Sequence, residues 1–61
     1  MDLLQIHIKE LKVGNHIVNL GKVLEIEPSE YSYSIVIERL NQKQVFKFDS
    51  NEMLYINKNR R

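Results

Sequence analysis

The chain is 61 residues long and carries nine basic and eight acidic residues, a formal net charge of +1. This length allows one domain of marginal stability, because so short a chain buries only about 60% of the surface that its unfolded form exposes. Cysteine is absent, which excludes disulfides and thiolate metal sites. No apolar run reaches the roughly 20 residues of a membrane helix.

Alternation of apolar and polar residues predicts strands along most of the chain. Residues 4–8 (LQIHI) show the period of two that is typical of a half-buried strand. Glycine and asparagine then predict turns at 14–15 and at 19–21. These turns flank a short second strand around Ile17.

The next predicted strand, residues 22–27, contains an irregularity. Val23 and Ile26 are three residues apart, so strict alternation does not turn both of them inward. We therefore expect a β-bulge between them, of the kind that bends a strand in a closing barrel. Pro28 ends this strand because proline donates no hydrogen bond to a ladder, and residues 27–30 are expected to form a hairpin loop.

The clearest alternation in the chain is YSYSIVIERL, residues 31–40, which predicts a long strand. A polar turn is expected at 41–43, followed by a strand whose two phenylalanines share one face. Residues 49–52 (DSNE) favour a capped single helical or 3₁₀ turn. A closing strand follows at 53–56.

Five or six short strands joined by tight turns, with no segment periodic enough for a full helix, predict an all-β fold. The chain is too short for a sandwich, so we expect a small, strongly bent, partly open barrel over residues 1–57. The basic tail at 58–61 has no periodicity and is expected to be disordered. The predicted core comprises Leu4, Ile6, Leu11, Val13, Ile17, Val23, Ile26, Tyr33, Ile35, Ile37, Phe46, Phe48 and one face of residues 53–56.

This order of elements resembles the SH3-like small barrels, including the KOW and Tudor types. The residues that carry the resemblance are Leu11, Gly14, Ile17, Gly21, Val23 and Ile26. The opening LKVGN, residues 11–15, is also similar to that of short uncharacterised bacteroidete and phage proteins. The basic loops of RNA-binding KOW domains and a complete aromatic cage are missing here, so the resemblance implies a binding module with its ligand left open.

The sequence offers little for catalysis, a metal or a cofactor. No serine lies in a motif that places a base beside it, and a barrel this small is filled by its own side chains, leaving no small-molecule pocket. A metal site would require His7 and His16 to converge with a carboxylate such as Glu10. We predict instead that His7 is an outward strand residue and His16 a turn-edge residue. The protein is therefore expected not to be an enzyme.

Two groups of residues are candidates for contact with a protein partner. By alternation Val36 falls on the polar face of its strand, and Leu24 is out of phase with its neighbour, so the two aliphatics are expected to form a small outward patch. Glu25 and Glu27 share a strand face and offer negative charge to a basic partner. Each group also has an ordinary explanation, since scattered surface aliphatics and solvated hairpin charges are common.

A nucleic-acid interface is the alternative. Tyr31 and Tyr33 offer rings on which bases stack, although the phase of Tyr33 predicts a core position and only Tyr31 is expected to be exposed. Lys58, Arg60 and Arg61 would contact phosphates. Without those three charges the rest of the chain holds six basic and eight acidic residues, a charge of −2, which disfavours nucleic acid.

These observations predict a non-enzymatic interaction module that binds another protein or itself. An origin in a phage or mobile element is a special case of this prediction. An accessory subunit of a larger complex is a further alternative that the sequence does not separate from the others. The N-terminus lacks the cationic and apolar regions of a secretory signal, so a cytoplasmic location is expected.

Overall fold

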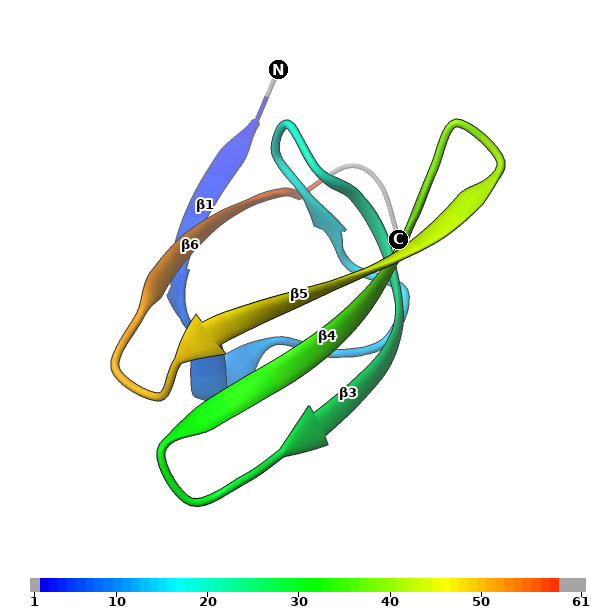
Figure 1. Ribbon diagram of the computed structural model, residues 1–61. Helices are drawn as coiled ribbons and strands as arrows, with labels where there is room; N and C mark the ends of the chain where they lie inside the picture. Colours follow the sequence, from blue (N-terminus) through cyan, green and yellow to red (C-terminus); the bar gives the residue numbers. More distant parts are fainter. Residues whose placement is uncertain (1, 59–61) are drawn as a thin grey trace.

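A computed structural model describes residues 2–58. It shows one antiparallel sheet of six strands that curls into a half-barrel (Figure 1). The elements are β1 (Leu3–His7), a 3₁₀ turn η1 (Ile8–Glu10), β2 (His16–Ile17), β3 (Gly21–Pro28), β4 (Ser32–Arg39), β5 (Gln42–Asp49) and β6 (Met53–Asn57). The predicted all-β class is confirmed, and the architecture is compatible with an SH3-like barrel. Within residues 2–58, no helix has the length and hydrophobicity to cross a membrane.

The strand order in the sheet is β1-β6-β2-β3-β4-β5. Strands β3, β4 and β5 follow one another as hairpins, whereas β6 returns from the end of the chain to lie between β1 and β2. Because this order does not close on itself, β1 and β5 are the two edges of the sheet. Within residues 2–58, each of these strands is paired with a neighbouring strand on one side only.

The predicted β-bulge is present in β3. Val23 lies opposite Ile37, but the next paired residue of β3 is Glu25, opposite Val36, so Leu24 is the extra residue. Because the bulge adds one residue, the side chains of Val23 and Ile26 both point inward although they are three residues apart. Val23 is accordingly fully buried, and Ile26 packs against the core.

The first predicted strand ends earlier than its alternation indicates. The His7 side chain accepts a hydrogen bond from the Lys9 N–H through Nδ1 (3.1 Å), and Glu10 Oε1 accepts one from the His7 N–H (3.0 Å). This reciprocal cap starts η1 and turns Ile8 into the core, where it is 1% exposed. His7 is therefore the cap of η1 rather than a simple outward strand residue.

Two predicted turns also differ from the structure. Residues 49–52 make a single capped turn, as expected, but it is too short to be a helix: the Glu52 N–H donates to the Asp49 carbonyl (3.0 Å) and the Asn51 N–H to the Asp49 side chain (3.2 Å). The turn expected at 41–43 lies earlier, because β5 already begins at Gln42. Only Leu40 and Asn41 connect β4 to β5.

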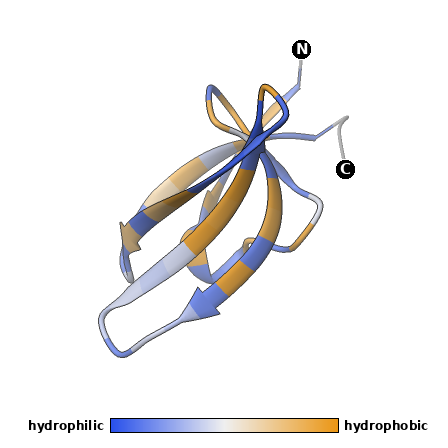
Figure 2. Cartoon of the chain, turned by 45° about the vertical axis from the view of Figure 1, so that its right-hand side comes forward, coloured by the Kyte–Doolittle hydropathy of each residue, from blue (hydrophilic) through white to orange (hydrophobic). Residues whose placement is uncertain are grey.

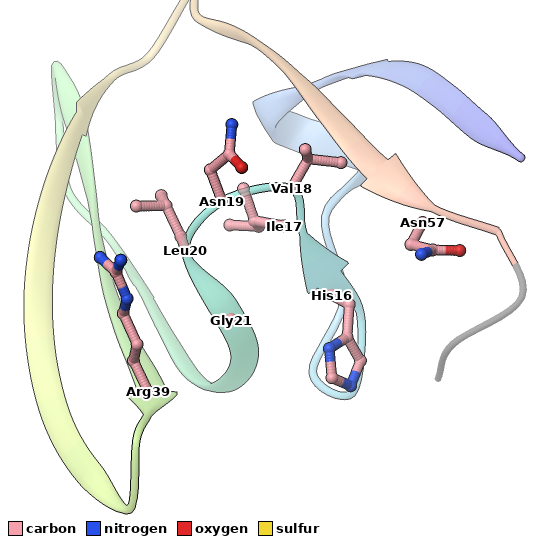
Figure 3. A pocket seen from close by; sticks show the side chains of 8 residues that line it. All are labelled: His16, Ile17, Val18, Asn19, Leu20, Gly21, Arg39 and Asn57. Atoms are coloured by element: carbon pink, nitrogen blue, oxygen red, sulfur yellow. The ribbon is translucent and has the colours of Figure 1, made fainter. Parts of the chain in front are cut away.

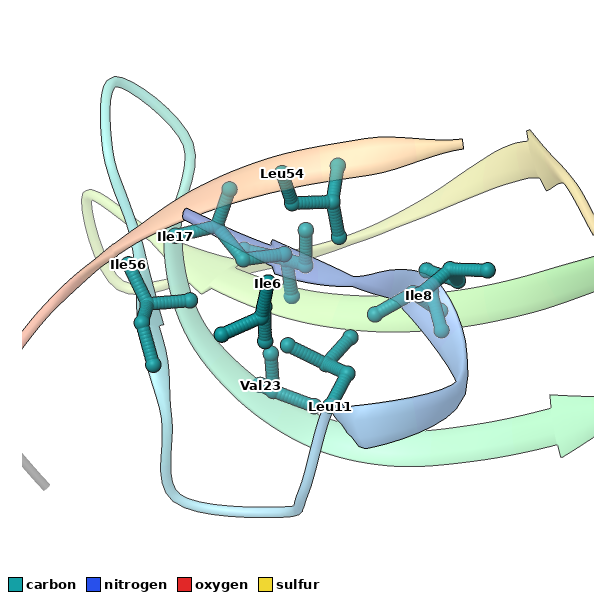
Figure 4. Packing of buried hydrophobic residues seen from close by; sticks show 9 residues of the cluster. Ile6, Ile8, Leu11, Ile17, Val23, Leu54 and Ile56 are labelled. Carbon is teal, nitrogen blue, oxygen red and sulfur yellow. The ribbon is translucent and has the colours of Figure 1, made fainter. Parts of the chain in front are cut away.

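Nine aliphatic side chains form one buried cluster inside the half-barrel (Figure 4). They are Ile6, Ile8, Leu11, Ile17, Val23, Ile35, Ile37, Leu54 and Ile56. Phe46, Phe48 and Tyr33 are partly buried against this cluster. Hydrophobic and hydrophilic residues alternate along the strands (Figure 2), as expected for a sheet with one buried face. Two predicted core residues are wrong: Leu4 is 43% exposed near the start of an edge strand, and Val13 is 62% exposed in the turn before β2.

Candidate functional site

The outer edge of β5 is an unpaired strand edge whose free backbone groups are assigned by hydrogen-bond alternation. The Ser50 N–H donates to the Tyr31 carbonyl (3.1 Å), so this pair is a hydrogen-bonded one. In an antiparallel ladder such pairs recur at every second residue. The even-numbered residues of β5, such as Gln44 and Phe46, therefore direct their backbone groups toward β4. The odd-numbered residues direct theirs away from the sheet.

The opposite side of β4 gives the same phase independently. The Ser29 N–H donates to the Ser32 carbonyl (2.8 Å), which makes the even-numbered residues of β4 bond to β3 and the odd-numbered ones to β5. Strand β4 is thus satisfied on both sides. The outward N–H and C=O groups of β5 belong to Lys43, Val45, Lys47 and Asp49. Because the Asp49 carbonyl already accepts from the Glu52 N–H, we call only Lys43, Val45 and Lys47 the free edge.

The side chains of the free edge lie on the outer face of the sheet, away from the core. Lys43 is opposite Glu38 on β4, and Val45 is opposite Val36. Lys47 is opposite Ser34, and all three free-edge side chains are exposed, Val45 by 69%. An exposed aliphatic residue therefore lies between two cations on an unpaired strand.

The β4–β5 hairpin carries two of the three most exposed large apolar side chains among residues 2–58. Leu40 at its tip is 87% exposed and Val45 on the free edge is 69% exposed, whereas the third, Tyr31 (75%), lies in the loop before β4. Single exposed apolar residues are normal, but two of them on a hairpin with an unpaired edge make this element a candidate contact surface.

Leu40 is also unusual in its backbone. Leu40 and Asn41 form a two-residue hairpin loop, and both have positive φ angles, 51° and 64°. Such loops favour asparagine, aspartate or glycine, because other side chains resist this conformation. Neither the backbone nor the core accounts for a leucine here, and a residue held in such a conformation is a candidate for a functional contact.

The residues predicted to contact a protein partner are partly brought together. Glu25 and Glu27 are exposed on the outer face of β3, where Glu25 lies opposite Val36. Leu24 is the half-buried bulge residue and has no register partner on β4. Across the ladder, the aliphatic residue opposite Val36 is Val45, on the face of β5 away from Phe46 and Phe48.

The residues of the predicted nucleic-acid interface are not gathered into one site. Tyr33 is half-buried opposite Phe48, whereas Tyr31 is exposed, as expected. The loop joining β3 to β4 lies at the lower end of the molecule in Figure 2. The start of β1 lies at the opposite end (Figure 1), and there the Lys58 N–H donates to the Asp2 carbonyl (2.9 Å). Arg60 and Arg61 lie outside the described residues.

A shallow hollow surrounds the turn between β2 and β3 (Figure 3). Its polar lining includes His16 and Arg39, but the two side chains lie on opposite sides of the turn and do not converge. Within residues 2–58, no group of three or more histidine, aspartate or glutamate side chains could hold a metal ion. The hollow therefore provides no geometry for a metal or a catalytic pair.

Comparisons of the chain with protein-family models, with curated proteins and with solved structures found no match. The free edge and the hairpin that bears it are the strongest candidate for a functional site within residues 2–58.

Proposed function

We propose that the protein is a non-enzymatic interaction module, an SH3-like barrel of the cytoplasm that binds another protein by adding an extended segment of it to β5. The observation that carries the proposal is the coincidence, on the β4–β5 hairpin, of an unpaired edge and two of the three most exposed large apolar residues among residues 2–58, Leu40 and Val45. A phage or mobile-element origin, with a host protein as partner, is a special case.

Strand addition suits this edge for two physical reasons. The outward N–H and C=O groups of an edge strand are a ready template for another chain, and their hydrogen bonds provide affinity while alternate side chains provide specificity. Strand β5 is eight residues long and contains no proline. Its lysines protect it from indiscriminate pairing, as charged residues do on natural edge strands, and Val45 between them remains an apolar contact.

The test is a pair of substitutions at one position. Because the Val45 N–H points away from β4, Val45→Pro removes an edge donor without removing a bond of the sheet. Val45→Thr keeps the N–H and the β-branched shape and serves as the matched control. We expect immobilised wild-type protein and Val45→Thr to retain a partner from nuclease-treated lysate of the native host, and Val45→Pro to lose it.

Amide spectra must show that each variant is folded. Retention of the same partner by folded Val45→Pro would refute strand addition at this edge. Loss of every retained protein on nuclease treatment would favour nucleic acid instead.

The nucleic-acid alternative has one specific observation in its favour, the 75% exposure of the Tyr31 ring. Single-stranded nucleic acid stacks on such rings, with phosphates held by basic groups and binding that weakens steeply with salt. Its cations would come from the C-terminal tail, and Lys58 lies at the other end of the half-barrel. Truncation after Asn57 should abolish this binding, and binding that resists high salt would exclude it.

A further inference from the structure

We propose that the segment bound along β5 is an acidic extended peptide, with carboxylates opposite Lys43 and Lys47 and apolar residues between them. This inference rests on the proposed strand addition and specifies its ligand. The partner segment runs antiparallel to β5, since antiparallel ladders are slightly more stable per residue than parallel ones.

The outer face determines the charge of the ligand. In an added antiparallel strand, the residues directly opposite Lys43, Val45 and Lys47 emerge on the same face as these side chains. Opposite charges across a ladder are favourable and like charges are unfavourable. Two acidic residues flanking an aliphatic one therefore match this edge, and a basic segment is rejected.

The two lysines are not equivalent. Lys43 already has an acidic neighbour in the sheet, Glu38 on β4, whereas Lys47 faces the neutral Ser34. A ligand carboxylate opposite Lys47 therefore meets a cation with no directly opposed acid, and one opposite Lys43 shares its cation with Glu38. We expect the Lys47 position to contribute more to the preference.

The inner face determines the ligand residues on either side of the carboxylate opposite Lys47. Phe46 and Phe48 are partly buried against the core, with ring centroids 6.5 Å apart. Ligand residues opposite these rings lie on the core side of β5 and remove more of the ring surface from water if they are apolar. From its N-terminal end, the ligand pattern is apolar, acidic, apolar, β-branched, any residue, acidic. Its first position lies opposite Phe48 and its last opposite Lys43.

A second copy of the chain fits the free edge poorly. Pairing of two β5 strands centred on Val45 places Lys43 of each copy opposite Lys47 of the other, two like-charge contacts. A register displaced by two residues places Lys43 opposite Asp49 instead. That register supplies a carboxylate opposite Lys43 only, since it places Val45 opposite Lys47, and the Asp49 carbonyl is already bonded to the Glu52 N–H.

The other edge of the sheet is no better a partner. By the same alternation, the Ile8 N–H bond to the Glu52 carbonyl leaves Leu3, Gln5 and His7 facing outward on β1. None of these side chains is acidic. Neither edge of a second copy therefore supplies carboxylates opposite both Lys43 and Lys47, so an acidic foreign segment matches the free edge better than a second copy does.

The experiment uses two labelled peptides of matched length, SVEFVTES and SVKFVTKS, at low ionic strength. We expect the acidic peptide to bind the wild-type protein about tenfold more tightly than the basic one, because two exposed ion pairs replace two repulsions. In the double variant Lys43→Glu with Lys47→Glu the preference should reverse. Amide resonances of the free edge should shift on binding, and Val45→Pro should abolish binding of either peptide.

The outcomes separate this inference from the function on which it rests. Equal affinity of the two peptides for the wild-type protein, or no measurable binding of the acidic one, overturns the acidic specificity. Either result leaves strand addition standing if lysate capture still depends on the Val45 N–H. Capture that survives Val45→Pro overturns the proposed function itself.

Discussion

Replacement of Gly21 by alanine should destabilise the protein severely, for two separate reasons: backbone strain and steric overlap. Gly21 starts β3 with a φ of 137°, a conformation that residues with a Cβ rarely adopt. An alanine Cβ would also overlap the backbone carbonyl oxygen of Glu38 on β4 and lie 3.1 Å from Ile37 Cγ2. Relief of the overlap requires the β3–β4 ladder to move.

The two effects are of similar size. Backbone strain of this kind costs on the order of 1–3 kcal/mol, and overpacking typically adds about 1–3 kcal/mol. We therefore expect a loss of about 2–6 kcal/mol from a total stability that, for a chain of this length, is about 3–9 kcal/mol. With a denaturant slope of about 1 kcal/mol per M urea, the midpoint should fall by roughly 2–6 M, or the folded state should disappear.

Asn19→Ala is the matched control in the same turn. Asn19 also has a positive φ, 69°, and it is exposed, so alanine there adds strain of only about 1 kcal/mol. Urea unfolding followed by circular dichroism compares the two variants. Equal losses, or a loss below about 1 kcal/mol for Gly21→Ala, would refute the close approach of β3 to β4 at this point.

Two further predictions concern the β4–β5 hairpin. The rate of amide hydrogen exchange, followed by NMR, should alternate along β5. Val45 and Lys47 should exchange at least about tenfold faster than Gln44 and Phe46, because only the latter two N–H groups bond to β4. Uniform protection along β5 would contradict the assigned free edge. Leu40→Asn should raise the melting temperature by a few degrees, since asparagine tolerates a positive φ at about 0.5–1 kcal/mol less cost than leucine. A lower melting temperature would show that the leucine makes contacts that stabilise the fold.

The strands and the bulge could be predicted from the sequence because both are local consequences of alternation. The three-residue spacing of Val23 and Ile26 is incompatible with a regular strand and compatible with one extra residue. The end of β1 was missed because Ile8 continues the alternation of its strand. The reciprocal cap between His7 and Glu10 has the spacing of a capping box, but histidine is not among the residues that usually begin one.

The free edge could not be predicted because strand order depends on contacts between distant parts of the chain. Only the return of β6 between β1 and β2 makes β5 an edge, and no local pattern encodes that return. A signal was nevertheless present. Lys43 and Lys47 on either side of an outward valine form the charged spacing that natural edge strands use against aggregation.

The strand order also has a consequence for how the chain folds. Strands β3, β4 and β5 pair across short loops, whereas β1 and β6 pair residues as far apart in sequence as Leu3 and Asn57. Closing a long loop costs more chain entropy, and contacts of long sequence separation slow folding. We therefore expect the meander of β3 to β5 to form early and the pairing of β1 with β6 to form last. A fraying N-terminus would then leave the β4–β5 hairpin, and with it the free edge, intact.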